Sequence, residues 1–254
     1  MDAMFSTMWP VLLIMFVAVV WIRRSNHQRH KEQVEINTTN AKLHGMGYQP
    51  PTPDDASGTL QGVHRFDGTT RGIVWNVETL YLNDQDAGVN THTYTNSQNY
   101  TRWTASQAGT AAGALILMNL PQGVKAPQID SGQGNSGFWS AVADKAANAA
   151  FQLFARLTFG NARSNTLPLS AEHRVQLAQD AFGSAFVAFS DQPDLLVRLN
   201  ANARELLLQE RDQRVAFLWD SQGLTLTWPV PFLSPEDIAK RSDFGALLAE
   251  ALRE

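Results

Sequence analysis

The segments Arg214-Val215-Ala216-Phe217-Leu218-Trp219 and Leu224-Thr225-Leu226-Thr227-Trp228 lie on either side of the short polar run Asp220-Ser221-Gln222-Gly223. Two runs of apolar and β-branched residues around a turn that contains glycine are typical of a β-hairpin. A short connection of this kind joins antiparallel strands, whereas parallel strands need a long crossover. The stretch therefore predicts an antiparallel sheet in the C-terminal half of the chain.

A β-rich region precedes this hairpin, between residues 59 and 122. Turn-forming residues such as Asp67-Gly68 separate runs that are rich in β-branched and aromatic side chains. The spacing of these runs predicts a meander of about four strands. The expected strands are Leu60–Phe66, Gly72–Leu82, Tyr94–Thr104 and Gly113–Leu120.

Residues 123–254 alternate helical and β patterns. Apolar side chains at helical spacing predict amphipathic helices, and Ser190 or Asp191 is suited to cap a helix that carries Pro193 in its first turn. The expected elements are helices over Phe138–Phe159, Ser170–Phe182 and Asn202–Glu210, and a strand over Ala185–Phe189.

The last helix has a clear start. Ser234-Pro235-Glu236-Asp237 supplies a capping hydroxyl, a first-turn proline and an acidic third position, which together are typical of a helix N-terminus. The apolar side of this helix comprises Ile238, Phe244, Leu247, Leu248 and Ala251.

The N-terminal segment predicts a membrane anchor. The 20 residues from Ala3 to Ile22 carry no charge, with Trp9 and Trp21 near the two ends. As a helix they span about 30 Å, the thickness of the hydrocarbon core, and tryptophan is enriched at membrane interfaces. A cleavable signal peptide would instead place basic residues before the apolar run, but here Arg23 and Arg24 follow it.

The same basic residues predict the orientation. Arg23, Arg24, Arg29 and Lys31 follow the apolar segment and only Asp2 precedes it. The positive-inside rule then places the N-terminus outside the inner membrane, on the periplasmic side, and the body in the cytoplasm. Residues 32–254 contain 16 basic and 23 acidic side chains, so the body carries a formal charge of −7.

These patterns predict an α+β fold: a single transmembrane helix followed by a mixed, largely antiparallel sheet with packed helices. The expected divisions are an anchor over 1–24, a juxtamembrane segment and Pro/Gly linker over 25–58, a β-rich subdomain over 59–122 and an α+β subdomain over 123–254.

Composition excludes several classes of function. The formal charge of the whole chain is −4, which argues against a nucleic-acid partner because such proteins carry a basic surplus. The chain has no cysteine, so disulfides, thiolate metal sites and cysteine nucleophiles are ruled out. Only His27 and His30 are close in sequence among the six histidines, and two ligands are too few for a typical metal site. We therefore expect no metal and no cofactor.

One glycine-rich loop leaves an alternative open. Gly132, Gly134 and Gly137 satisfy the spacing G-x-G-x-x-G ahead of the expected helix Phe138–Phe159. A dinucleotide fold needs a strand that ends at the first glycine, but the preceding strand is expected to end near Leu120. A loop without a ligand is therefore favoured, and a nucleotide-binding or sensing loop is the alternative. The sequence contains no G-x-S-x-G motif and no H-R-D-like segment, so it predicts no catalytic residue.

Several short apolar patterns resemble a bacterial family of membrane-anchored cytoplasmic proteins of unknown function. The likeness spans about residues 60–235 and rests on Gly62-x9-Gly72-Ile73-Val74, on the stretch from Phe182 to Pro193, and on Leu206-Leu207-Leu208. The resemblance implies a membrane segment ahead of the β-rich region. It implies no catalytic residues.

Together these features predict a non-catalytic accessory, assembly or scaffold subunit, held in the membrane by one helix next to other integral membrane proteins. The competing hypothesis is a membrane-tethered enzyme or small-ligand sensor that uses the loop 132–137. A third is capture of a partner strand on an open edge of the β-rich region.

Overall fold

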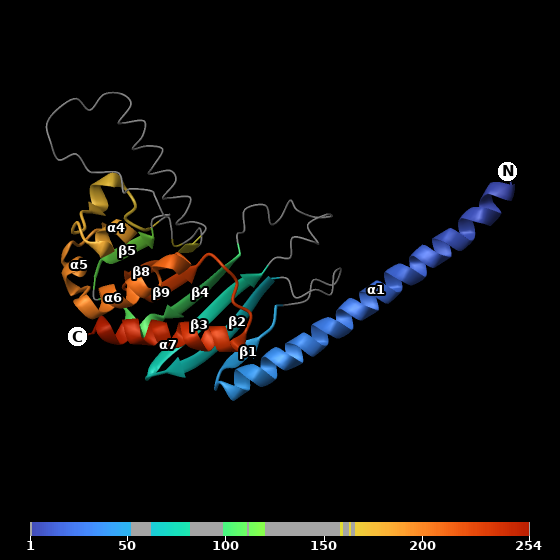
Figure 1. Cartoon of the computed structure of the whole chain (residues 1–254), viewed down its shortest axis with the longest axis horizontal. Helices are drawn as coiled ribbons and strands as arrows, with labels where there is room; N and C mark the ends of the chain where they lie inside the picture. Colours follow the sequence, from blue (N-terminus) through green and yellow to red (C-terminus); the bar gives the residue numbers. More distant parts are fainter. Residues whose placement is uncertain are drawn as a thin grey trace, which may run out of the picture.

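The computed structural model describes residues 2–51, 62–81, 99–110, 112–119, 158–159, 163 and 166–253. In helix α1, the side chains of residues 2–12, 23, 26, 27 and 30 are not among those described. The expected helix Phe138–Phe159, apart from its last two residues, and the loop 123–137 lie outside the described residues. The fold is α+β, with one large antiparallel sheet and several helices (Figure 1).

The sheet has nine strands in the order β1-β2-β3-β4-β9-β8-β5-β7-β6, and every pairing among them is antiparallel. The expected meander holds for β2 to β4, but it is wrong for β5, which lies between β8 and β7. Strands from before and after residue 122 thus form a single sheet. The strands are β1 (Gly47–Gln49), β2 (Gly62–Thr70), β3 (Ile73–Tyr81), β4 (Tyr100–Ala105), β5 (Ala114–Asn119), β6 (Arg174–Val175), β7 (Phe186–Ser190), β8 (Ala216–Asp220) and β9 (Gly223–Trp228).

The hairpin expected on either side of Asp220-Ser221-Gln222-Gly223 is confirmed as β8 and β9, which pair from Asp220↔Gly223 to Ala216↔Thr227. The expectation that Asp67-Gly68 forms a turn is wrong, because both residues lie inside β2. The turn between β2 and β3 is Arg71-Gly72, where both residues have positive φ, as a two-residue hairpin turn requires. Gly68 stands in the strand because the Trp75 ring lies against it: an added Cβ would meet the ring at 2.6 Å.

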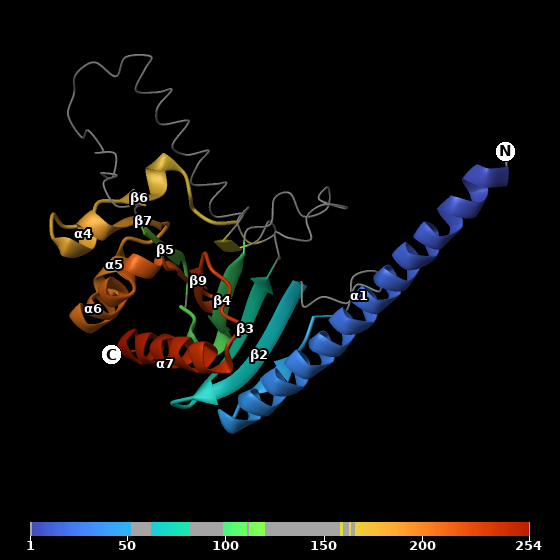
Figure 2. The same cartoon turned by 45° about the vertical axis from the view of Figure 1, so that its right-hand side comes forward.

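Five helices and three short 3-10 turns accompany the sheet among the described residues. Helix α7 lies across one face (Figures 1 and 2), and helices α4, α5 and α6 gather at one end. The helices are α1 (Asp2–Leu43), α4 (Ala181–Ala185), α5 (Asp194–Arg198), α6 (Ala201–Gln209) and α7 (Pro235–Ala251); the 3-10 turns are η2 (Ser106–Ala108), η3 (Ala171–His173) and η4 (Arg211–Gln213).

The core divides between the two faces of the sheet. The larger cluster joins the sheet to helices α4 to α7 and contains the buried rings of Trp75, Trp103 and Trp228. The smaller cluster lies on the opposite face of β5, β7 and β8, where Phe159 and Leu169 cover the strands. The opposite face of β2, β3 and β4 instead carries polar side chains, and this half of the sheet forms the candidate site described below.

The expected helix Ser170–Phe182 is wrong. This segment contains η3, the short strand β6 and only the start of α4, because Arg174 and Val175 pair with Phe189 and Ala188 of β7. Strand pairing here overrides the local helical pattern. The helix begins later, at Asp180, whose Oδ1 accepts a hydrogen bond of 2.8 Å from the Gly183 amide.

Of the two helix N-caps expected from the sequence, one is confirmed and the other is wrong. Ser234 caps α7 as predicted, since its side chain accepts from the Asp237 amide. The expectation that Ser190 or Asp191 caps the next helix is wrong: Pro193 holds that position in α5. Asp191 Oδ1 instead accepts from the Ala114 amide at 2.7 Å, and Ser190 Oγ donates to the Ala114 carbonyl, so both side chains join β7 to β5.

Helix α1 projects away from the body, with the N-terminus at its far end (Figures 1 and 2). In the part of the chain that the structure describes, no helix is long and apolar enough to cross a membrane. The first ten residues of the expected span, Ala3–Leu12, have no described side chains.

Candidate functional site

The described apolar part of α1 is exposed along its whole length. Nine large apolar side chains between Leu13 and Ile22 are about half exposed or more, up to 69% for Phe16 and 70% for Trp21. Ten consecutive helical residues point in every direction around the axis, since each turn takes 3.6 residues. This part of the helix is therefore apolar all round, rather than amphipathic with one face toward the body.

The predicted anchor residues are only partly described. Trp21 and Arg24 are exposed on α1, whereas the side chains of Trp9 and Arg23 lie outside the described residues. Arg29 and Lys31 are exposed one to two turns after Arg24. Gly132, Gly134 and Gly137 also lie outside the described residues, so the ligand-loop hypothesis stays a prediction.

The other end of α1 is fixed to the body by its C-terminal cap. The Met46 amide donates to the Ala41 carbonyl and the Gly45 amide donates to the Lys42 carbonyl, with Gly45 at a φ of +70°. This pair of bonds is the Schellman motif, in which glycine takes the left-handed position. Ala41 and Met46 are both buried in the larger core cluster, so the last turn of the helix packs into the body.

A polar network lies beside this junction. The Tyr48 hydroxyl shares a hydrogen bond of 2.9 Å with Nδ1 of the buried His64. Burial raises the pKa of the Tyr48 phenol, and a hydrogen bond from Asn37 of α1 opposes that rise. The network thus links α1, β1 and β2 through side chains that are shielded from water, which strengthens their interaction.

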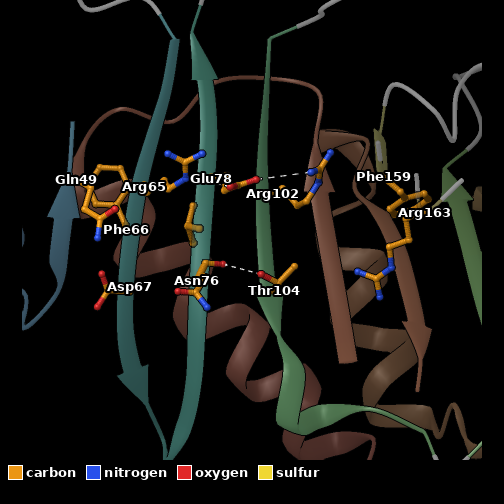
Figure 3. A pocket seen from close by; sticks show the side chains of 11 residues that line it. Gln49, Arg65, Phe66, Asp67, Asn76, Glu78, Arg102, Thr104, Phe159 and Arg163 are labelled. Atoms are coloured by element: carbon orange, nitrogen blue, oxygen red, sulfur yellow. Dashed lines mark hydrogen bonds and ion pairs between the residues drawn. The ribbon is translucent and has the colours of Figure 1, made fainter. Parts of the chain in front are cut away.

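The polar half of the sheet face is hollowed, with a volume of about 490 Å³. We call this feature the sheet hollow. Figure 3 shows its side chains on neighbouring strands, with Phe159 and Arg163 at one side. The lining residues are Gln49, Arg65, Phe66, Asp67, Asn76, Val77, Glu78, Arg102, Thr104, Phe159 and Arg163.

Strand register arranges these side chains in two rows. Arg65 lies opposite Glu78, and Glu78 lies opposite Arg102. Two residues further along β2, Asp67 lies opposite Asn76, and Asn76 lies opposite Thr104. Side chains directly opposite each other on one face of a sheet are close enough to interact. The hollow therefore has a charged row beside a second row of carboxylate, amide and hydroxyl groups.

In the charged row, two guanidinium groups share one carboxylate. Arg65 Nε lies 3.2 Å from Glu78 Oε1, and Arg102 Nη1 lies 3.7 Å from Glu78 Oε2. Arg102 is also held by two hydrogen bonds from its guanidinium to the Thr158 carbonyl. The row therefore has a surplus of one positive charge.

The rim of the hollow is fixed by a second ion pair. Arg163 Nη2 donates to both oxygens of Asp220, at 2.7 and 2.9 Å, and Arg163 Nη1 donates to Thr225 Oγ1 at 2.9 Å. A guanidinium held in this way has few donors left for a ligand, so Arg163 shapes the rim rather than offering a free charge.

The structure brings one serine, histidine and carboxylate together, in the turn before β6. Ser170 Oγ lies 2.7 Å from His173 Nδ1 and 3.1 Å from Glu172 Oε1. In a catalytic triad the serine and the acid contact opposite nitrogens of the imidazole, whereas here both approach Nδ1. The arrangement is therefore a local contact among side chains of neighbouring residues and not a catalytic triad. No group of three or more potential metal ligands occurs among the described residues.

The sheet hollow was not among the sites expected from the sequence. Polar residues do alternate along each strand, as in Arg65 and Asp67 or Asn76 and Glu78, and alternation of this kind indicates one solvated face. The pairing register that places Glu78 between two arginines could not be read from a single strand. The chain matches no family model and no curated protein, so the resemblance over residues 60–235 remains a prediction.

Proposed function

We infer that this protein is a single-pass inner-membrane protein, with a cytoplasmic α+β body that serves as a non-catalytic accessory, assembly or scaffold subunit of a larger membrane complex. The observation that carries the proposal is the exposed apolar segment Leu13–Ile22 of α1. Large contiguous apolar surfaces mark membrane or protein interaction sites.

Lipid is the environment that suits this surface best. A partner helix covers one side of an apolar helix, whereas lipid covers all sides, and the segment is apolar all round. Together with Ala3–Leu12, the charge-free run has the length that spans a bilayer. The exposed Arg24, Arg29 and Lys31 then lie at the cytoplasmic headgroups, as the positive-inside rule requires.

The rest of α1 supports a scaffold role. Residues 23–43 continue the same helix and extend about 30 Å at 1.5 Å per residue. We call residues 23–43 the stalk. The Schellman motif and the buried Ala41 fix the C-terminal end of the stalk to the sheet. A continuous helix of this kind holds the body at a fixed distance from the membrane. A fixed distance of this kind suits a scaffold that positions one protein beside another.

A charge in the apolar segment tests the anchor. Val17→Asp places a carboxylate near the middle of the bilayer, at a cost of about 3 kcal/mol, and should move most of the protein out of carbonate-washed membranes. Ile36→Asp is the matched control, because Ile36 is also an exposed apolar residue of α1 but lies on the stalk. Equal membrane retention of both variants would contradict the anchor.

Partner binding needs a separate experiment. The wild-type chain, extracted in mild detergent, should elute as part of a larger assembly whose other members co-purify from native membranes. A strictly monomeric protein under these conditions would contradict the accessory role and leave the anchor untouched. Protease access to the C-terminal body in sealed inverted vesicles tests the orientation.

A further inference from the structure

The sheet hollow contains polar groups that have no partner in the part of the chain that the structure describes. Arg65 has its Nε bound to Glu78, and its two terminal nitrogens have no hydrogen-bond partner among the described residues. The same holds for the carboxylate of Asp67 and the amide of Asn76. Arg65 lines the hollow and its side chain is 56% exposed, so a ligand in the hollow can reach this guanidinium.

These free groups differ in chemistry along the hollow. The Arg65–Glu78–Arg102 row has two cations for one anion and attracts an oxyanion, which a guanidinium can hold with two parallel hydrogen bonds. Asp67 and Asn76 form the neighbouring row, about 7 Å away along the strand. Asp67 accepts hydrogen bonds and repels anions, so this row favours neutral donors such as hydroxyl groups.

We propose that the sheet hollow binds a small hydroxylated oxyanion, of which a polyol phosphate is the simplest example. Its anionic end lies on Arg65 next to Arg102, and its hydroxyl groups lie against Asp67 and Asn76. The volume of about 490 Å³ falls within the range of small-molecule sites. A three-carbon polyol phosphate is long enough to reach both rows.

The geometry favours a free molecule over a lipid headgroup as the source of the phosphate. The hollow includes Gln49, which follows the C-terminal end of α1, and the stalk separates that end from Ile22 by about 30 Å of helix. The site itself uses only contacts within the body, whereas the preference for a free molecule over a lipid headgroup rests on the proposed membrane anchor.

Titration calorimetry on the full-length protein in detergent tests the site. Glycerol 3-phosphate should bind saturably and more tightly than inorganic phosphate, and glycerol alone should not bind. Arg65→Gln should weaken glycerol 3-phosphate binding about tenfold or more, the effect of losing a charged hydrogen bond. Arg198→Gln is the matched control, since Arg198 is exposed on α5 and makes no ion pair with any described residue.

Asp67→Asn gives a second test, with an effect on phosphate binding opposite to that of Arg65→Gln. Removal of this carboxylate should leave phosphate binding unchanged or stronger, while the preference for glycerol 3-phosphate over phosphate falls. Circular dichroism shows whether Arg65→Gln still folds. If it does not, the Asp67→Asn result alone tests the proposal.

Three results would overturn the proposal. One is the absence of saturable glycerol 3-phosphate binding at millimolar concentration. Another is an equal effect of Arg65→Gln and Arg198→Gln. The third is binding to nanodiscs that contain phosphatidylglycerol, relative to phosphatidylcholine nanodiscs, without binding of free glycerol 3-phosphate, which would identify a lipid contact instead.

Discussion

The two long helices at the ends of the chain use their apolar side chains in opposite ways. Helix α7 buries Ile238 and Leu248 completely against the sheet, whereas α1 leaves Phe16 and Trp21 about 70% exposed. Both are continuous helices, so helix formation does not explain the difference. What differs is the partner: α7 lies across the sheet, and α1 extends beyond it (Figure 2). Apolar residues of α7 therefore stabilise the body, while those of α1 between Leu13 and Ile22 remain exposed, as the proposed anchor requires.

The strongest test of this difference between α7 and α1 is to truncate one leucine in each helix. Leu248→Ala should lower the free energy of unfolding of the body by about 2–5 kcal/mol, because it removes a buried side chain and leaves a cavity. Leu13→Ala, in detergent, should change it by less than about 0.5 kcal/mol. Urea unfolding followed by tryptophan fluorescence measures both, and similar losses would contradict the division of roles.

The packing of α7 on the sheet depends on a glycine. Gly245 lies against the fully buried Trp103 ring, and a Cβ added there would meet the ring at 2.7 Å. Gly245→Ala should therefore lower the free energy of unfolding by about 1–3 kcal/mol through overpacking, although alanine favours the helix itself by about 1 kcal/mol. A stabilised variant would show that α7 can shift on the sheet.

A double mutant isolates this contact. Trp103 Nε1 has no hydrogen-bond partner in the described part of the chain, so Trp103→Phe removes ring volume without breaking a hydrogen bond seen there. Gly245→Ala should cost less in the Trp103→Phe background than alone, with a coupling energy of at least about 0.5 kcal/mol. Additive losses would mean that the clash lies elsewhere.

Sequence patterns predicted the elements whose signals are local. The hairpin β8–β9, the strands β2 to β5 and the Ser234 cap of α7 each follow from residues next to one another in the chain. The same local reasoning failed at Asp67-Gly68, which looks like a turn. Only the Trp75 ring on the adjacent strand, which occupies the space of a Cβ, explains why glycine stands inside β2.

The candidate site was beyond sequence reasoning for the same physical reason. Arg65, Glu78 and Arg102 come from three strands, and a shift of one residue in pairing would turn each set to the other face. The helix expected over Ser170–Phe182 failed because β7 was available to pair with Arg174 and Val175. Apolar runs and helix caps depend on residues that are close in sequence, so a single segment predicts them. Rows of side chains across strands depend on the pairing register, which exists only after the sheet has formed.

Substitutions at the capped ends of α7 and α1 should have smaller effects on the free energy of unfolding. Ser234→Ala should cost about 1 kcal/mol, since the Asp237 amide loses its side-chain acceptor at the start of α7. Ser234→Asp should retain most of the stability because aspartate also caps. At the end of α1, Gly45→Ala should cost about 1–2 kcal/mol in strain at a φ of +70°. Thermal unfolding measures both, and no loss in Gly45→Ala would mean that the stalk is not fixed to the body there.

The smallest effect concerns Tyr48, which lies beside the junction between α1 and the body. Burial raises the pKa of its phenol above the ordinary value of 10.0, so between pH 10 and the folded pKa the native state holds a proton that the unfolded state releases. The stability that this provides is complete below pH 10 and is lost as the pH rises through the folded pKa. Tyr48→Phe should therefore have a free energy of unfolding that depends less steeply on pH in the alkaline range than that of the wild type. Urea unfolding from pH 8 to 11 measures the slopes, and an unchanged slope in Tyr48→Phe would mean that the junction opens to solvent before the phenol ionises.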